Sequence, residues 1–182
     1  MERFWNYIHV TIFNAFKTIH NYLTIIDPFR LFFNIPFVKK IYARRGIHNP
    51  NEMIDNIVLK NEKTGLYSIW AGIQMGGLLV LIEYGLFNIL QAILGKPLIQ
   101  YVWESNLYKW VFIIVLLIMP WVINNQLLWK DDKYLKYFEQ FDQETKKVKT
   151  KWFLISLAVI IGITVFFILT FVLLSNVPMD VN

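Results

Sequence analysis

The stretch GLYSIWAGIQMGGLLVLIEYGLFNILQAILG, residues 65–95, decides the fold of this chain. It contains no Lys or Arg and a single formal charge, Glu83. It is also longer than the roughly 20 residues that a helix needs to cross a bilayer. A run this long and apolar predicts a membrane-spanning helix rather than the core of a soluble domain. We place its membrane part at residues 67–87.

One narrow stripe of this predicted helix carries glycines and its only acid. At about 100° per residue, Gly65, Gly72, Gly76 and Glu83 fall close together on one side, and Gly77 adjoins them. Small residues let helix backbones approach closely in lipid. The stripe therefore predicts a helix-packing face, used either within the chain or between copies.

Two further apolar runs, residues 109–129 and 152–174, predict a second and a third span. Pro120 is expected to kink the second span, and Gly162 is a small packing position in the third. Residues 97–108 predict a short loop on the membrane surface, and residues 176–182 a short external tail. Together with the linking loop 130–151, residues 65–175 form the predicted membrane region.

The preceding region, residues 1–64, predicts helices that do not span. The first 26 residues form an amphipathic pattern with Asn6 and His9 on the polar side, and the helix would stop at Asp27-Pro28. Such a helix either lies at the membrane surface or docks under the bundle. Residues 29–42 predict an interfacial or re-entrant segment, and Asn49 is expected to cap a short helix that reaches about Lys60.

The loop between the second and third spans, residues 130–151, predicts a helical cytoplasmic hairpin. Tyr134, Leu135, Phe138 and Phe141 recur at helical spacing after the KDDK motif at residues 130–133. We therefore expect the second span to continue as a helix past this motif.

The distribution of Lys and Arg predicts the topology. Nine precede the first span, two lie between the first and second, seven lie between the second and third, and none follows. The positive-inside rule then places the N-terminus in the cytoplasm and the C-terminus outside, in a plasma (inner) membrane. Two basic groups predict a surface for anionic lipid or a soluble partner: Lys39, Lys40, Arg44 and Arg45, and Lys146, Lys147, Lys149 and Lys151.

Polar residues within the spans are the candidates for a pore or a polar contact. Glu83 is either an interfacial carboxylate or an acid that faces an oligomer or pore axis. Asn124, Asn125 and Gln126 are either a helix end that leaves the membrane or a functional group, acting as a polar constriction or as a latch against the first span. Gln74 lies off the glycine stripe and is expected to bond to another helix or to a headgroup.

Nothing in the sequence predicts catalysis. There is no Cys, and therefore no thiol nucleophile or Cys-ligated zinc site. Phosphate-binding, hydrolase and metalloprotease motifs are missing, and the three His residues do not form a ligand pattern. We expect no catalytic residue, no metal and no cofactor. The basic residues flank apolar blocks, which does not favour nucleic acid as a partner.

The sequence thus predicts an all-α integral membrane protein with three transmembrane helices, an N-terminal amphipathic or interfacial helix and a helical cytoplasmic hairpin. The leading hypothesis is a non-enzymatic oligomeric or accessory subunit of a membrane assembly. A homo-oligomeric channel or membrane-permeabilising effector is the alternative. A transporter or membrane-embedded enzyme is less favoured, because no internal repeat or catalytic cluster is visible.

Overall fold

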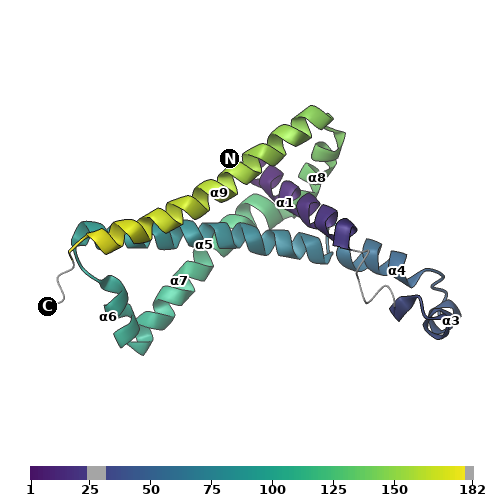
Figure 1. Ribbon diagram of the computed structural model, residues 1–182, viewed down its shortest axis with the longest axis horizontal. Coiled ribbons are helices and arrows are strands. Elements are labelled where there is room, and N and C mark those ends of the chain that lie inside the picture. The colour runs from purple at the N-terminus through teal and green to yellow at the C-terminus, as the bar shows by residue number, and fades with distance from the viewer. Residues whose placement is uncertain (24–31, 179–182) are drawn as a thin grey trace.

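The computed structural model describes residues 1–23 and 32–178, and within these ranges every regular element is a helix (Figure 1). Three helical segments are long and apolar enough to cross a membrane. They are built on α5 (Leu66–Leu94), α7 (Asn106–Asn124) and α9 (Lys146–Asn176). The three predicted spans are thereby confirmed as helices, although α5 and α9 extend beyond the predicted apolar parts.

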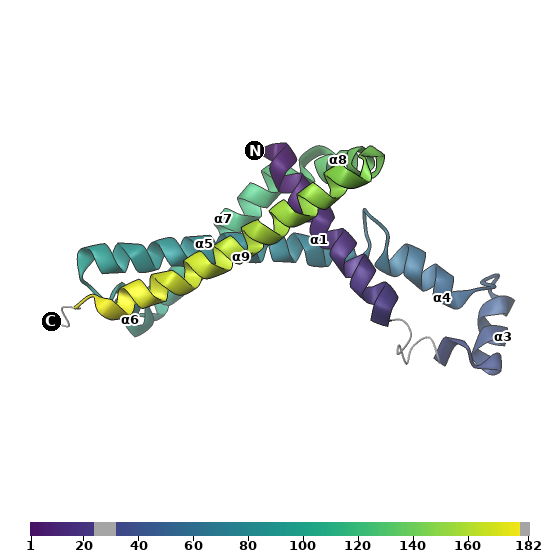
Figure 2. The ribbon, with the colours of Figure 1, turned by 45° about the horizontal axis from the view of Figure 1, so that its top comes forward.

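The N-terminal helix, α1 (Glu2–Leu23), packs in the space between two of these helices. α5 and α9 lie side by side toward their C-terminal ends and diverge toward their N-terminal ends (Figures 1 and 2). α1 packs between the diverging ends and also contacts the segment that follows α7. Residues 5–13 are all buried, so this helix docks on the bundle rather than lying flat on a membrane.

α1 also packs against the helical segment that follows the second span, which contains a kink. α7 continues as a π-helix, η2 (Asn125–Trp129), and a short turn, η3 (Lys130–Asp132), before α8 (Lys133–Gln143) begins. Asp131 and Asp132 adopt left-handed conformations, with φ of 60° and 50°. The chain therefore stays helical past the KDDK motif, as predicted, but with a kink at these two residues.

Beyond this kink, α8 packs against α1. Tyr134, Phe138 and Phe141, which were predicted to share one face, are all buried on the α1 side. The predicted helical hairpin between the second and third spans is thus observed, and its apolar face is covered within the chain.

Residues 36–59 extend beyond the N-terminal end of α5 (Figure 1). They comprise α3 (Pro36–Arg44), α4 (Pro50–Met53) and the π-helix η1 (Ile54–Leu59). The side-chain oxygen of Asn49 accepts a hydrogen bond from the backbone N–H of Glu52 at 3.3 Å, which confirms the predicted cap. The predicted stop at Asp27-Pro28 and the last tail residues, 179–182, lie outside the described residues.

At the opposite end of α5, the predicted surface loop contains a helix. Gly95 ends α5 with a φ of +62°, a conformation that favours glycine. α6 (Leu98–Glu104) then follows, and the backbone N–H of Ile99 at its start donates to the side chain of Gln91 at 2.9 Å. This side-chain contact could not be read from the local sequence of residues 97–108.

Candidate functional site

A groove between α5 and the α7–η2 segment is the main hollow beside the predicted glycine stripe. Its volume is about 660 Å³. Gly72, Gly76 and Gly77 contribute from α5, and Asn124 and Trp129 contribute from the other wall. The rim is built from bulky apolar residues of both helices: Ile69, Ile73, Val80, Leu117, Pro120 and Trp121. The groove is therefore floored by small residues and walled by large ones.

Two of the predicted packing glycines are in contact with side chains of their own chain. A Cβ placed on Gly72 would lie 3.3 Å from Cζ2 of Trp129, and one on Gly76 would lie 3.6 Å from Nδ2 of Asn124. Gly65 is also tightly placed, because a Cβ there would lie 2.7 Å from the carbonyl oxygen of Leu59. These three positions pack against their own chain.

The other two predicted packing glycines have no such contacts. No heavy atom of the described chain lies within 4 Å of a Cβ placed on Gly77 or Gly162. Gly77 nevertheless lines the groove, whereas Gly162 does not. Close packing of Gly162 is thus not observed among the described residues, where this position is exposed.

The predicted polar triplet after Pro120 is divided between three environments. Asn124 is buried, and its side-chain oxygen accepts a hydrogen bond from Nε1 of Trp5 at 2.9 Å. Asn125 is half-buried, and Gln126 is exposed. The neighbouring carbonyl of Leu127 accepts a hydrogen bond from Nδ2 of Asn6 at 2.8 Å. The triplet therefore serves in part to hold α1.

The structure does not bring Glu83 to this triplet. Glu83 is half-buried on α5 and is not among the residues that line the groove. Its Oε2 is buried and receives no hydrogen bond from the described residues. Gln74 is exposed and borders a separate, smaller hollow with Ile12 and Leu78. A shared polar path through these predicted residues is not seen.

A second buried polar contact, between α5 and α9, was missed by the sequence analysis. Nδ2 of Asn88 donates to Oγ1 of Thr170 at 3.2 Å, and Nε2 of Gln91 donates to Oδ1 of Asn88 at 3.4 Å. Next to it, a Cβ on Gly85 would lie 2.6 Å from Cε1 of Phe166. The sequence signal for this contact is a pair of amides three residues apart. Both amides lie beyond residues 67–87, the predicted membrane part of this span.

Ion pairs fasten the start of α1 to the α8 hairpin. Glu2 accepts from Nζ of Lys133 at 2.8 Å and from the hydroxyl of Tyr137 at 3.1 Å. The hydrogen bond from Lys133 lowers the pKa of the Glu2 carboxyl. Arg3 pairs with Glu144 at 3.1 Å, and the Tyr7 hydroxyl donates to the same carboxylate. The carboxylates of Glu2 and Glu144 are therefore each paired with a cation where α1 meets the α8 hairpin.

His9 is the one strongly shifted titratable group in the α1 interface. It is 1% exposed and meets the ring edges of Tyr134 and Phe138, each with its centroid at 5.8 Å. Burial lowers its pKa to about 4, and the backbone of Ser68 opposes this shift. His9 is therefore neutral at pH 7.

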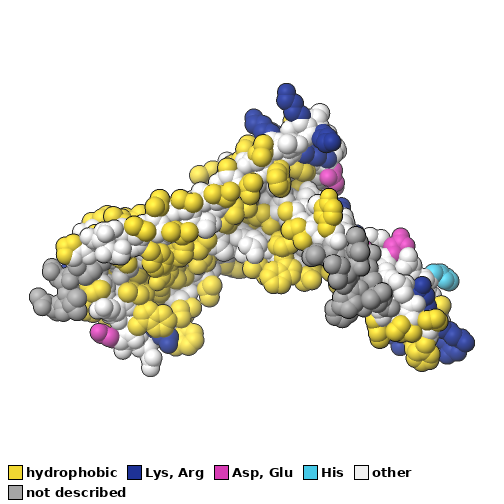
Figure 3. Space-filling view, in the orientation of Figure 1, with side chains coloured by type: hydrophobic (Ala, Val, Ile, Leu, Met, Phe, Trp, Pro, Cys, Tyr) yellow, Lys and Arg dark blue, Asp and Glu magenta, His cyan; other side chains and the backbone are white. Residues whose placement is uncertain are grey.

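The two predicted basic groups lie on different elements. Lys39, Lys40, Arg44 and Arg45 are exposed on and just after α3. The second group opens α9, where Lys and Arg side chains gather at one end of the molecule (Figure 3). Hydrophobic side chains cover much of the face over α5 and α9 in the same view. Charge and apolar surface are therefore segregated along the bundle.

No protein-family model matches the chain, and comparisons with curated proteins and with solved structures also found no match. Among the residues that the structure describes, no three His, Asp or Glu residues gather as a metal site would require. The observed class is an all-helical protein with three candidate membrane spans. The groove between α5 and the α7–η2 segment and the two basic groups are therefore the features that bear on function.

Proposed function

We propose that this chain is a non-enzymatic polytopic membrane protein that acts as an accessory subunit, and that a transmembrane helix of another membrane subunit docks in the groove. The observation that carries the proposal is the open glycine, Gly77, on the groove between α5 and α7. Gly72 is buried and Gly76 half-buried against their own chain, whereas Gly77 is exposed and has no neighbour within 4 Å of a Cβ.

The physics of helix association in lipid supports this occupant. Lipid tails are as apolar as Leu side chains, so association depends on close packing rather than on a hydrophobic driving force. A helix can approach α5 closely at Gly77, while the exposed side chains of Ile73 and Trp121 would pack along its sides. The groove also offers Ser68 and Asn124 as polar neighbours near one end.

The proposed orientation has the N-terminus in the cytoplasm and the C-terminus outside, in the plasma (inner) membrane. The support is the charge asymmetry, since 16 of the 18 Lys and Arg residues flank the N-terminal ends of α5 and α9 or the C-terminal end of α7. A reporter enzyme that is active only in the cytoplasm, fused to the C-terminus, should be inactive. Activity of that reporter would overturn this orientation.

The α3 segment is the proposed site for a soluble cytoplasmic partner. Phe37 is 72% exposed, and Ile41 is also exposed on the same helix as Lys40 and Arg44. Exposed apolar residues interleaved with cations suit an acidic partner that also has apolar side chains.

A pore receives less support from the geometry. A conducting path would need Glu83 and the Asn124 amide to face one passage, yet Asn124 is bonded to Trp5 and Glu83 lies outside the groove. Ion flux from vesicles that contain the purified chain, lost in Glu83→Gln, would favour the pore over the accessory subunit.

Matched glycine substitutions test helix docking. Leu at Gly77 or Gly162 meets no described atom within 4 Å of its Cβ, so both variants are expected to fold like the wild type. Gly77→Leu should reduce co-purification of the partner subunit from native membranes by tenfold or more, because Leu would block close approach in the groove. Gly162→Leu should leave co-purification unchanged.

Cross-linking supplies an independent measurement, because the chain has no Cys of its own. Ile73→Cys lies at the groove, and Ile161→Cys lies on α9 with a similar exposed fraction, 54% against 52%. We expect a membrane-permeant cross-linker to trap a partner from Ile73→Cys only. Equal trapping at both positions, or unchanged co-purification in Gly77→Leu, would refute docking in the groove.

A further inference from the structure

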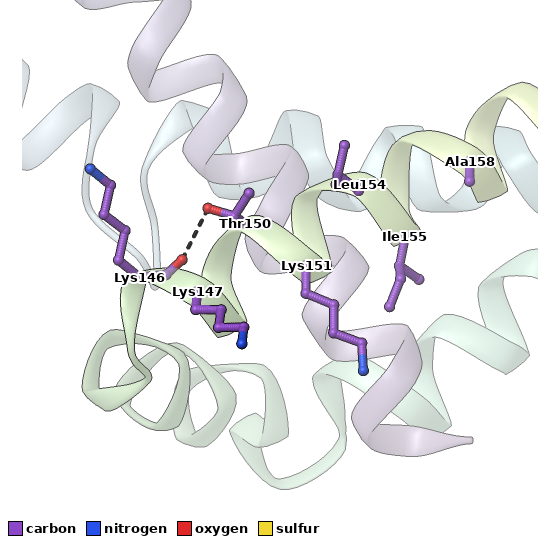
Figure 4. A pocket seen from close by; sticks show the side chains of 7 residues that line it. All are labelled: Lys146, Lys147, Thr150, Lys151, Leu154, Ile155 and Ala158. Carbon is purple, nitrogen blue, oxygen red and sulfur yellow. Dashed lines mark hydrogen bonds between the residues drawn. The ribbon is translucent and has the colours of Figure 1, made fainter.

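The first three turns of α9 carry a stripe that changes from cationic to apolar (Figure 4). Lys147, Lys151 and Ile155 follow one another at four-residue spacing, so they share one side of the helix. With Leu154 and Ala158 they line a shallow hollow of about 710 Å³. The change in character coincides with the start of the third apolar run at residue 152.

The lysines of this stripe have no anionic partner in the described part of the chain. Lys146, Lys147 and Lys151 are exposed, and no ion pair involves them among residues 1–23 and 32–178. Lys149 differs, because its Nζ donates to the carbonyl of Asp142 at 2.9 Å and lies 5.7 Å from the Phe141 ring centroid. The predicted group of four lysines therefore divides into one internal and three external cations.

The two acids that come just before α9 in the sequence are already engaged. Glu144, two residues before the helix, pairs with Arg3 and accepts from Tyr7. Asp142 lies 4.0 Å from Lys149. Lys147 and Lys151 are therefore available to an anion from outside the chain.

We propose that this stripe, which we call the lysine–alanine face, binds one anionic phospholipid. The phosphate lies between the ammonium groups of Lys147 and Lys151, and an acyl chain runs along Leu154, Ile155 and Ala158. The separation suits a lipid, because Lys151 and Ala158 are about 10 Å apart along the helix axis at 1.5 Å per residue. The small side chain of Ala158 leaves room for the acyl chain.

The two-part chemistry selects a lipid over a soluble acidic protein. Lysines next to an apolar span lie at headgroup depth, where anionic lipids attract them. The apolar half of the hollow belongs to a helix that is long and apolar enough to lie in hydrocarbon. A soluble protein could reach the lysines but not Ala158, whereas a phospholipid reaches both.

Lipid retention by the full-length chain tests the assignment. The protein is reconstituted into vesicles of phosphatidylcholine with one-fifth phosphatidylglycerol, extracted in a mild detergent, and examined by native mass spectrometry. We expect wild type to retain phosphatidylglycerol in preference to phosphatidylcholine. The double variant Lys147→Gln/Lys151→Gln should lower that preference on the order of 30-fold, from the contribution of two surface lysines.

Three controls make the result specific. Lys149→Gln removes a neighbouring charge that is used internally, and should keep the preference. Lys147→Arg/Lys151→Arg should also keep it, because the charge remains. Ala158→Phe fills the apolar half and should weaken retention without changing any charge.

The proposal is overturned if wild type retains both lipids equally, or if Lys149→Gln has the same effect as the double variant. Unchanged phosphatidylglycerol retention in the double variant would also overturn it. Gly77 lies on another helix, so failure of the proposed helix docking would leave this result interpretable.

Discussion

Acidification should release α1 from the bundle through His9. His9 is neutral and buried in the folded chain, with a pKa of about 4, against about 6.5 when it is exposed. Below pH 6.5 the unfolded chain therefore binds a proton that the folded chain does not. Stability is fully present above pH 6.5, is lost as pH falls, and stops falling near pH 4.

The size of the loss follows from these two pKa values. Between pH 7 and pH 5, proton binding by the unfolded chain should lower the free energy of unfolding by about 2 kcal/mol. The ion pair between Glu2 and Lys133 should add to the loss only at lower pH, because Lys133 keeps the Glu2 pKa below its usual value. That ion pair therefore contributes little between pH 7 and pH 5, and comparison with a His9 variant identifies the contribution of His9.

The measurement is unfolding of the full-length chain in mixed micelles by increasing sodium dodecyl sulfate, followed by circular dichroism at pH 7 and pH 5. The control is His9→Phe, which suits the surrounding rings of Tyr134 and Phe138 and cannot bind a proton. His20 and His48 remain in both proteins, so their contribution cancels in the comparison. Equal pH dependence in wild type and His9→Phe would refute the reasoning.

Two further predictions concern packing. Trp5→Phe removes the 2.9 Å hydrogen bond to Asn124 and leaves a buried amide oxygen unpaired, so the same unfolding assay at pH 7 should show a loss of about 1–3 kcal/mol. A neutral effect would mean that this bond does not hold α1. Gly85→Ala should destabilise the chain by about 1–3 kcal/mol, because a Cβ would lie 2.6 Å from Phe166. Gly162→Ala should stabilise it by about 0.5–1 kcal/mol through helix propensity, and the reverse order of these two variants would contradict the observed packing.

The three spans could be predicted because the signal is local. A helix needs only a long apolar run to be recognised as a span, and each predicted run lies within a helical segment. The ends were less predictable, because helices continue where the apolar run stops. α9 begins at Lys146, six residues before the third predicted span.

The environment of α1 could not be predicted because distant residues decide it. Asn6 and His9 lie on the polar side of the amphipathic pattern, yet both are buried. Asn6 donates to the carbonyl of Leu127, and His9 packs against α8 beyond the kink at Asp131 and Asp132, both more than a hundred residues away in the chain. Sequence periodicity does not indicate where an Asp adopts a left-handed backbone conformation. The amphipathic pattern of α1 was therefore compatible with both a surface helix and a docked helix.

The contacts of the glycines likewise could not be predicted from sequence, and these contacts bear on the proposed function. Spacing identified Gly72 and Gly76 as a surface of close approach, but it could not say which atoms approach. The structure fills both positions from within, with Trp129 and Asn124, and leaves Gly77 open beside them. Internal packing therefore uses one side of the stripe and shapes the groove that the other side presents. A partner helix would have to contact both Gly77 and the α7 side of the groove. Substitution of Gly77 is therefore expected to impair assembly without impairing folding.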